Sequence, residues 1–336
     1  MGECIRMEKI SVILPAYKAE NTIRDTIDSI EKQIYKNIEL IVIENGPKDS
    51  TESIVNDYRN IGIDIKYFYC EKSNVSNARN IGIKNATGKY IAFIDSDDKY
   101  EKNFLSKMVE CLESNNSQLV TCGYKTSDNK KILLIKKNNK IKCTKNFQMY
   151  LEVLKSNLLF NEIWNKLYVS SIIKENNVFF DELYELGEDY LFNLDYMKYI
   201  EKACYINEPL YIYTVSCDGL KQKYRKDKFD IEYRLTKILK EYYEKKGYSM
   251  DFVYNQTARI YYNGIIDIFK KNNLVRNKEK DEQLKEFIKR EKYRKDLEFL
   301  KDKVTDKKFK IAIKYFFLKS KARIKLFVLL NSLLHR

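Results

Sequence analysis

The sequence predicts an α/β fold with a mostly parallel sheet flanked by helices, followed by a helical C-terminal extension. Three observations support this prediction. Apolar segments with strand character alternate with helical segments over the first hundred residues, polar residues follow these strands, and the chain becomes charged and helical after residue 224. Alternating strands and helices form parallel sheets with helices on both faces, in which ligands bind beyond the carboxyl ends of the strands.

The elements can be assigned in order along the chain. Apolar strands are predicted at residues 10–15, 38–43 and 63–69 and in a run that ends at Asp95. The first helix is indicated by isoleucines at helical spacing, and the second by the capping box Asp49-Ser-Thr-Glu52. Further helices are predicted at residues 76–86, 101–114 and 169–175, and from Glu188 to about residue 197. The polar strand ends are therefore expected to share one crevice.

Three carboxylates follow the fourth predicted strand. The segment Lys89-Tyr-Ile-Ala-Phe-Ile-Asp95-Ser96-Asp97-Asp98 leads an apolar run directly into Asp95, Asp97 and Asp98. Carboxylate oxygens suit Mg²⁺ or Mn²⁺, and Mg²⁺ commonly binds through one or two carboxylates plus substrate phosphates. The cluster indicates either a site for a metal-bound diphosphate or a helix cap provided by Asp97 or Asp98.

Five segments of the chain form an ordered set. They are Ser11-Val-Ile-Leu-Pro-Ala-Tyr17, Glu39-Leu-Ile-Val-Ile-Glu-Asn-Gly46, Ser76-Asn-Ala-Arg-Asn-Ile-Gly82, Phe93-Ile-Asp-Ser-Asp-Asp98 and Gly187-Glu-Asp189. In this order they resemble the inverting glycosyltransferases of family 2, which have the Rossmann-like GT-A fold, and correspond to its opening strand, nucleotide loop, S-x-A-R-N-x-G segment, D-x-D metal motif and general-base motif. The resemblance covers roughly the first two thirds of the chain, and the ordered set is far more specific than any single motif.

The resemblance implies a donor site at the first three segments. Pro15 and Tyr17 would line the nucleotide pocket, Glu44 or Asn45 would meet the base, and Arg79 would lie near the nucleotide. The loop reads Glu44-Asn-Gly-Pro47, where the family often has D-D-G-S, so the base contact and the base itself stay open. UDP is preferred from the prevalence of UDP-sugars in the family. Taken alone, the loop is an ordinary turn and Arg79 an ordinary solvated helix residue.

The same resemblance implies the chemistry of the last two segments. Asp95 and Ser96 would approach the ribose or the metal shell, and Asp97 would coordinate Mn²⁺ or Mg²⁺, which neutralises charge on the departing diphosphate. Asp189 would accept the proton of the acceptor hydroxyl as general base, so that the product has inverted anomeric configuration. Without the resemblance, Asp189 would simply complement a helix dipole.

The acceptor is expected between the two carboxylate motifs. The segment Asn161-Glu-Ile-Trp-Asn-Lys-Leu-Tyr168 resembles a W-N-K-L-Y segment near the acceptor side of the family. Trp164, Lys166 and Glu188 are therefore assigned to the acceptor, because sugars bind well against flat aromatic faces with polar edges. Packing of Trp164 in the core is an equally open interpretation, which leaves Lys166 as the preferred acceptor or phosphate contact.

The chain of 336 residues is expected to hold a catalytic domain at residues 1–224 and a basic helical region at residues 225–336. Within the first, a nucleotide-sugar half would span about 8–125 and an acceptor half about 126–224. Seven cysteines without a C-x-x-C pair favour reduced thiols and a cytoplasmic protein. Residues 1–8 are too short and polar for a signal peptide, and no stretch reaches the charge-free span of about 20 residues that a transmembrane helix needs.

The C-terminal region is predicted to be four helices, at residues 227–246, 251–271, 278–301 and 307–334. Residues 301–336 hold eleven Lys/Arg and two Asp, interspersed with apolar residues at helical spacing. This pattern is typical of a basic amphipathic helix on an anionic membrane, which the net charge of +14 supports. Docking of the helix on its own domain, or on a second subunit of a homo-oligomer, is the alternative.

Together these features predict a metal-dependent inverting glycosyltransferase of the hexosyl or N-acetylhexosaminyl type. It would move a sugar from a nucleotide-sugar to a glycan or lipid-linked acceptor in cell-surface polysaccharide biosynthesis, at the inner face of the cell membrane. A catalytically silent GT-A scaffold is the alternative. A nucleic-acid-binding protein would explain the positive charge, but the chain has no recognised nucleic-acid motif, so no nucleic acid is expected as partner.

Overall fold

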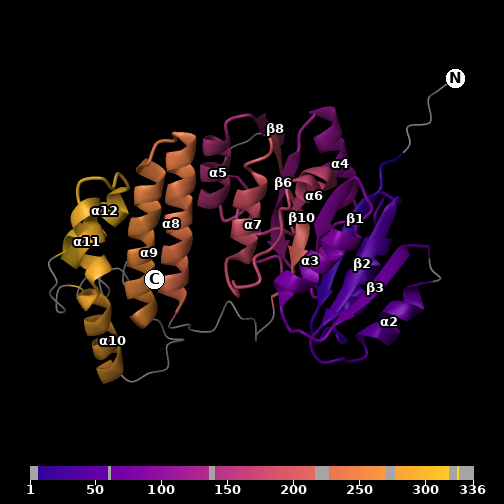
Figure 1. The fold of residues 1–336 in the computed structure, drawn as a ribbon, viewed down its shortest axis with the longest axis horizontal. Helices are drawn as coiled ribbons and strands as arrows, with labels where there is room; N and C mark the ends of the chain where they lie inside the picture. Colours follow the sequence, from indigo (N-terminus) through magenta and orange to yellow (C-terminus); the bar gives the residue numbers. More distant parts are fainter. Residues whose placement is uncertain are drawn as a thin grey trace. The chain divides into compact units, whose positions relative to one another are not determined.

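The computed structural model describes residues 7–59, 62–135, 141–215, 227–269, 277–317 and Ile324. The chain divides into two compact units, Met1–Ser216 and Cys217–Arg336 (Figure 1). The domain boundary predicted near residue 224 lies outside the described residues.

The first unit contains a ten-stranded sheet and its flanking helices. Its strands are β1 (Ile10–Ala16), β2 (Ile38–Asn45), β3 (Asp64–Cys70), β4 (Tyr90–Phe93), β5 (Lys99–Tyr100), β6 (Leu119–Thr126), β7 (Ile132–Leu133), β8 (Ile141–Thr144), β9 (Lys166–Val169) and β10 (Ala203–Tyr213). Its helices are α1 (Ile23–Glu31), α2 (Thr51–Tyr58), α3 (Val75–Asn85), α4 (Phe104–Ser114), α5 (Phe147–Ser156), α6 (Ser170–Glu175) and α7 (Glu188–Tyr196). The first three strands begin within one residue of their predicted starts.

The sheet has the order β3-β2-β1-β4-β9-β6-β10-β5, with β7 paired to β6 and β8 to β10. The strands β3, β2, β1 and β4 are parallel, as predicted. The strand β9 is antiparallel to both of its neighbours, β4 and β6, so the whole sheet is mixed rather than mostly parallel. The strand-helix repeat of the first hundred residues therefore predicts the parallel pairing of β1 to β4 but not the rest of the sheet, because β9 runs in the opposite direction.

Helices cover both faces of the parallel strands. Val12 and Leu14 on β1 pack in one core cluster with Ile27 of α1. The alternate residue Ile13 faces α3, where a Cβ added to Gly82 would lie 2.4 Å from its Cγ2 atom. Successive side chains of a strand point to opposite faces, so β1 is buried on both sides. The glycine of the S-x-A-R-N-x-G segment lets α3 approach the sheet closely (Figure 1).

One expectation about the cysteines is wrong. Cys143 on β8 lies directly opposite Cys204 on β10 in an antiparallel pair, and their sulfurs form a disulfide. Sixty-one positions separate the two residues in the sequence, so their spacing gave no sign of the pairing. Cys70, Cys111 and Cys122 are free thiols, as expected.

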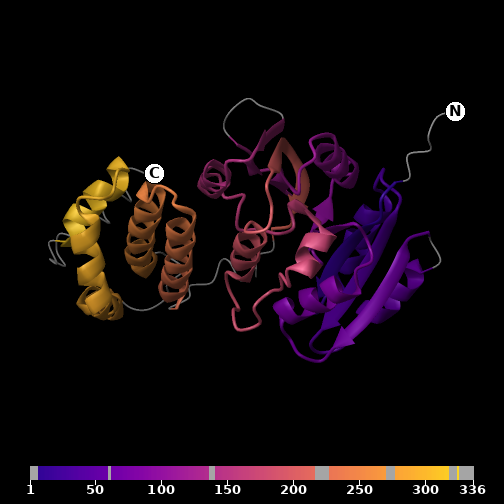
Figure 2. The same cartoon turned by 45° about the horizontal axis from the view of Figure 1, so that its top comes forward.

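The second unit is helical, with α8 (Lys228–Lys246), α9 (Asp251–Phe269), α10 (Asn277–Lys289), α11 (Glu291–Leu300) and α12 (Lys307–Phe317). The helices α8 and α9 lie side by side in both views (Figures 1 and 2). The predicted helix at 278–301 is two helices, because Arg290 leaves the helical conformation with φ −57° and ψ 132°. Its guanidinium pairs with Asp230 at 3.0 Å and lies over the ring of Phe287, which fixes the bend.

The final predicted helix is docked on its own unit over its described part. Ile313, Phe316 and Ile324 are buried in the core of the C-terminal unit, whereas Lys310 and Lys314 are exposed. The apolar face that was assigned to a membrane is therefore covered by protein in the described residues, and the predicted helix beyond residue 317, apart from Ile324, lies outside them. In the described part of the chain, no helix is long and apolar enough to cross a membrane.

Candidate functional site

The predicted donor residues gather at the carboxyl ends of the parallel strands. Pro15 pairs with Ile43 near the ends of β1 and β2, and Ala16 pairs with Glu44. The strand β4 pairs with the other side of β1 and ends two residues before Asp95. Parallel strands end at the same edge of a sheet, so this edge collects the polar residues as the sequence predicted.

The nucleotide loop is held by Glu44. Its carboxylate is buried, with Oε1 accepting from the backbone N–H of Asp49 at 3.0 Å and Oε2 accepting from the Tyr67 hydroxyl. Burial and this hydrogen bond raise the pKa of Tyr67. Both oxygens of Glu44 are thus engaged within the protein, which assigns it to shaping the loop rather than to a free base contact. Asn45 beside it is also buried, with 4% of its surface exposed.

The Tyr17 side chain is exposed to solvent at the carboxyl end of the parallel strands. The side chain is 48% exposed and its ring lies against Gly46, where an added Cβ would come within 2.8 Å of Cε2. Gly46 has φ +99°, a conformation that favours glycine. The loop glycine therefore allows the Tyr17 ring to stand beside the nucleotide loop with one face toward solvent.

Arg79 joins the two carboxylate motifs. Its Nη1 atom donates to Asp189 Oδ1 at 2.7 Å and to Glu188 Oε1 at 3.2 Å, while Nη2 donates to Asp95 Oδ1 at 3.2 Å. The guanidinium side chain is only 5% exposed, so the interpretation of Arg79 as a solvated residue is wrong. Its partners come from the end of β4 and the first turn of α7. We call these four residues the Arg79 cluster.

The Arg79 cluster carries three carboxylates against one guanidinium. Burial alone would lower the pKa of Arg79, but the surrounding carboxylates of Asp189, Asp95 and Glu188 outweigh it and raise that pKa. Burial raises the pKa of Asp189 well above its ordinary value; Arg79 opposes this rise, and the like charges of Glu188 and Asp95 add to it. A raised carboxyl pKa makes Asp189 a stronger proton acceptor, which is the property a general base requires.

The D-x-D turn is anchored by Asp98, for which no site role was predicted. Asp98 is fully buried, with Oδ2 accepting from the Tyr211 hydroxyl at 2.6 Å and Oδ1 from the backbone N–H of Thr214 at 2.6 Å. It therefore ties the turn to β10, and neither Asp97 nor Asp98 caps α4, which begins at Phe104 after Asn103. The only signal in the sequence was a third carboxylate beside D-x-D.

Asp95, Ser96 and Asp97 are each half-buried on this anchored turn. Asp97 also lines a cavity of about 350 Å³, together with Thr22 and Lys99. Two carboxylates with hard oxygen atoms, on a turn that remains partly open to solvent, suit Mg²⁺ or Mn²⁺, with donor phosphates supplying further ligands. The residues present therefore fit the implied metal.

The acceptor assignments of Trp164 and Lys166 are corrected by the structure. Trp164 is 2% exposed and stacks on Tyr211 with ring centroids 4.1 Å apart. Lys166 is fully buried, and its ammonium donates to carbonyl oxygens of Leu159 and Phe160 at 3.0 and 3.2 Å and to that of Glu162. Burial lowers the pKa of Lys166 to about 7. Neither side chain is open to an acceptor, and Lys166 instead stabilises the loop at residues 159–162 through these carbonyl groups. Glu188 remains at the site because Arg79 binds it.

Known proteins resemble a large part of the chain. Residues 11–176 match the family model described as Glycosyl transferase family 2. The chain is 30% identical over 214 residues to the uncharacterized glycosyltransferase EpsJ of Bacillus subtilis, which covers 63% of this chain and 62% of EpsJ. It is 29% identical over 218 residues to the glycosyltransferase GlyA of Streptococcus pneumoniae, covering 62% of this chain and 31% of GlyA. The matches thus span less than two thirds of these relatives' own length.

Solved structures share the fold over a larger part of the chain. S. aureus TarS 1-349 in complex with UDP-GlcNAc matches with a TM-score of 0.68 and 19% identity, covering 94% of this chain and 89% of that one. The mannosyltransferase PcManGT of Pyrobaculum calidifontis, in complex with GDP-Man and Mn²⁺, matches with a TM-score of 0.52 and 14% identity, covering 94% and 89%. At these identities the likeness establishes the fold, which is the GT-A fold that the sequence predicted.

Proposed function

Because the chain belongs to glycosyltransferase family 2, we propose that it transfers a hexosyl or N-acetylhexosaminyl group from a nucleotide-sugar to a glycan or lipid-linked acceptor, with inversion. The observation that carries this proposal is the Arg79 cluster, in which one buried guanidinium binds both Asp95 of the donor motif and Asp189 of the base motif. Cell-surface polysaccharide biosynthesis is the proposed setting, as the resemblance of the sequence to family 2 implies.

In the proposed reaction, Tyr17 and the loop after β2 receive the nucleotide at the carboxyl edge of the sheet. Asp95 and Asp97 would hold a divalent metal, which as a Lewis acid would stabilise charge on the leaving diphosphate. UDP is the preferred nucleotide, supported by the UDP-GlcNAc complex of the structural neighbour TarS, whereas the GDP-Man complex of PcManGT keeps GDP as the competitor.

Asp189 is the proposed general base. Its Oδ1 is fixed by Arg79 at 2.7 Å, which orients the carboxylate, and burial raises its pKa, which strengthens it as a proton acceptor. The acceptor hydroxyl would lose its proton to Asp189 while its oxygen forms the new bond to the anomeric carbon, and the bond to the diphosphate oxygen breaks on the opposite face. Arg79 stays protonated throughout and serves as a positioning residue.

The test compares Asp189→Asn with the wild-type protein in transfer from UDP- and GDP-sugars. Loss of the base should lower the transfer rate by about 10²–10⁴-fold while nucleotide binding, followed by calorimetry, stays unchanged. Asp195→Asn on the same helix is the matched control, because the carboxylate of Asp195 pairs with Lys198 instead of Arg79. Transfer at the wild-type rate by Asp189→Asn would show that the base is assigned wrongly.

The metal is tested through Asp97→Ala with Mn²⁺, Mg²⁺ or chelator. Mutation of a residue that only hydrogen-bonds to a metal ligand typically lowers metal affinity by about 10–100-fold. Loss of the proposed ligand Asp97 itself should therefore weaken metal-dependent donor binding by at least this factor. Absence of nucleotide binding in the folded wild-type protein, with every metal, would favour the silent scaffold instead.

We also propose that the protein associates with an anionic membrane through the positive charges of α12, without insertion of its apolar face. Lys307, Lys308, Lys310 and Lys314 of α12 are exposed while the apolar face of this helix is buried. A basic residue near an anionic surface contributes about 1 kcal/mol, and salt screens the effect. The protein should therefore sediment with phosphatidylglycerol vesicles at low salt and dissociate at high salt; binding that resists high salt would indicate insertion instead.

A further inference from the structure

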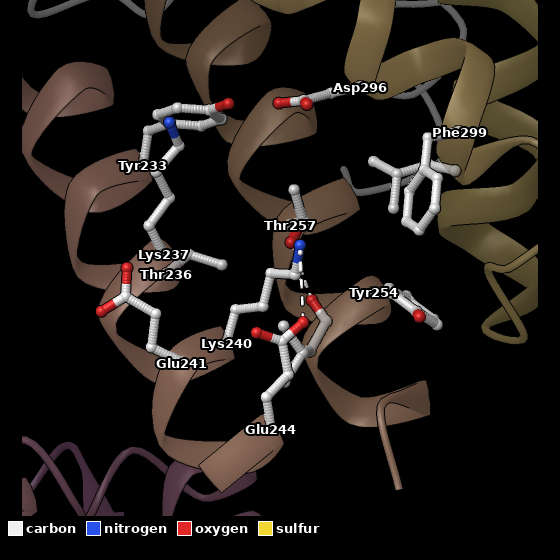
Figure 3. A pocket seen from close by; sticks show the side chains of 12 residues that line it. Tyr233, Thr236, Lys237, Lys240, Glu241, Glu244, Tyr254, Thr257, Asp296 and Phe299 are labelled. Carbon is white, nitrogen blue, oxygen red and sulfur yellow. Dashed lines mark hydrogen bonds and ion pairs between the residues drawn. The ribbon is translucent and has the colours of Figure 1, made fainter.

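The C-terminal unit contains a pocket that the proposed chemistry does not use. It has a volume of about 270 Å³ and lies between α8, α9 and α11 (Figure 3). Three aromatic side chains, Tyr233, Tyr254 and Phe299, and five charged side chains line it. We call it the helical pocket.

The helical pocket has an aromatic wall that is partly open to water. Tyr254 and Phe299 meet edge to face, with ring centroids 5.4 Å apart and an interplanar angle of 74°. Phe299 is 51% exposed although it carries no polar group. Figure 3 shows these two side chains across the pocket from Lys240 and Glu241 of α8. A flat apolar ring bordered by polar groups is the surface against which the C–H face of a sugar packs.

The polar groups of the helical pocket are held in place. Asp296 accepts a hydrogen bond from the Tyr261 hydroxyl at 2.7 Å, and the Tyr233 hydroxyl is hydrogen-bonded to the same carboxylate, which together with burial raises the pKa of Tyr233. Lys240 lies 3.6 Å from Glu244, and the Lys237 ammonium lies 5.1 Å from the centre of the Tyr233 ring. Donors and acceptors are thus both present around the aromatic wall.

The charges of the helical pocket select among ligand classes. Two lysines, Lys237 and Lys240, face three acids, Glu241, Glu244 and Asp296, so the lining has no excess of positive charge. A phosphate or a nucleic-acid backbone needs such an excess. A neutral sugar does not, because each hydroxyl both donates and accepts, to carboxylates and ammonium groups alike. The pocket volume of about 270 Å³ is just below the range of about 300–1,000 Å³ for small-ligand pockets, which suits a ligand of one or two sugar rings.

We propose that the helical pocket binds a neutral sugar unit of the acceptor glycan, with a sugar face against Phe299 and Tyr254 and hydroxyls bonded to the charged rim. This inference rests on the proposed function for the identity of its ligand as the acceptor, but not for sugar binding itself.

The experiment measures binding of neutral disaccharides to the full chain by saturation-transfer NMR, with chitobiose, cellobiose and lactose as probes and glycerol phosphate as the charged comparison. Phe299→Ala removes the aromatic wall and should weaken disaccharide binding about tenfold, equivalent to about 1.4 kcal/mol. Ile311→Ala is the matched control, because Ile311 is also exposed, at 53%, but does not line the pocket. Its binding should equal that of the wild type.

Several outcomes would overturn the proposal. Disaccharide binding that survives Phe299→Ala unchanged would place the sugar elsewhere, and absence of binding in a protein whose circular dichroism is native would remove the site. Binding of glycerol phosphate but not of the neutral sugars would show that the pocket takes a charged ligand instead of a neutral sugar. The same binding measurement on Asp189→Asn separates this inference from the proposed function. If Phe299→Ala loses sugar binding, Asp189→Asn keeps it and the wild-type protein shows no transferase activity, the result would support the pocket and contradict the proposed enzyme.

Discussion

Two acids near opposite ends of the parallel strands, the buried Glu39 and the partly buried Asp189, have opposite electrostatic properties. Glu39, the second residue of β2, is fully buried and accepts hydrogen bonds from Ser11, from the backbone and hydroxyl of Thr87, and from Lys66. Burial alone would raise its pKa, but these bonds lower it to about 2. Asp189, at the carboxyl ends, shares one guanidinium with Asp95 and Glu188, and burial raises its pKa.

The difference separates a charge that stabilises the fold from a charge that suits the proposed chemistry. A carboxylate surrounded by donors gains stability from being ionised, as Glu39 does. Neighbouring carboxylates disfavour the ionised form of a carboxylate such as Asp189. They therefore raise its pKa and make it a better proton acceptor. The amino end of the sheet therefore carries a structural acid, and the carboxyl end carries the acid that we propose as the general base.

The largest expected effect is on the structural side of this comparison. Glu39→Gln should lower the free energy of unfolding by about 3–5 kcal/mol, because Lys66 loses a buried ionic partner and several donors lose their acceptor. Urea unfolding measures it, with Glu52→Gln in the exposed pair with Lys48 as a control expected to change by less than about 0.5 kcal/mol.

The pH dependence of the same variant sharpens this result. The pKa of Glu39 is lowered from 4.5 to about 2, so its stabilisation is complete above pH 4.5 and is lost as the pH falls toward 2. Wild type should lose stability in this window more steeply than Glu39→Gln. Parallel curves for the two proteins would contradict the account of Glu39 as the structural acid.

The next effect is at the reactive end. Arg79→Lys keeps the positive charge but loses the planar fork that reaches three carboxylates, and should lower the free energy of unfolding by about 2–3 kcal/mol, since hydrogen bonds to charged groups contribute about 1.5–3 kcal/mol each. Transfer should fall as well, because Asp189 loses its orientation. Arg24→Lys, in an exposed pair with Asp57, is the matched control. Equal stability of both variants would mean that the Arg79 cluster is not a fixed unit.

A smaller effect is expected where the D-x-D turn is anchored. Tyr211→Phe removes the hydroxyl that donates to Asp98 and leaves that buried carboxylate with one fewer donor, at a cost of about 1–2 kcal/mol. Tyr199→Phe, an exposed position at 42%, should have no measurable effect. Thermal unfolding compares them, and metal-dependent donor binding should weaken only in Tyr211→Phe, because only there is the turn loosened.

The smallest effect has the opposite sign. The pKa of Asp189 is raised in the folded protein, so its contribution to stability is greatest below its unfolded pKa and is lost as the pH rises through the folded value. Asp189→Asn should therefore melt at a higher temperature than wild type at pH 7, and the gap should shrink toward pH 4. A lower melting temperature of the variant at pH 7 would show that Asp189 is a structural acid like Glu39.

Part of the site was predictable because motif residues follow strands directly. Asp95 and Asp97 come after an apolar run, and Tyr17 after β1, so periodicity alone located them at strand ends. Glu44 shows the limit of this reasoning: its place at the end of β2 was evident, but its burial and its bond to Tyr67 depend on β3, which lies beside it.

Local periodicity and ordered spacing were enough to predict the strand-helix repeat, the family resemblance and the positions of the motif residues. Which side chains meet depends instead on the tertiary structure. Arg79 and Asp189 are 110 positions apart, and Cys143 and Cys204 are 61 positions apart. Lys166 was predicted to contact the acceptor or a phosphate, but its side chain is buried. Such contacts depend on sheet order and on the helices that cover it, which join residues without any regular spacing along the chain.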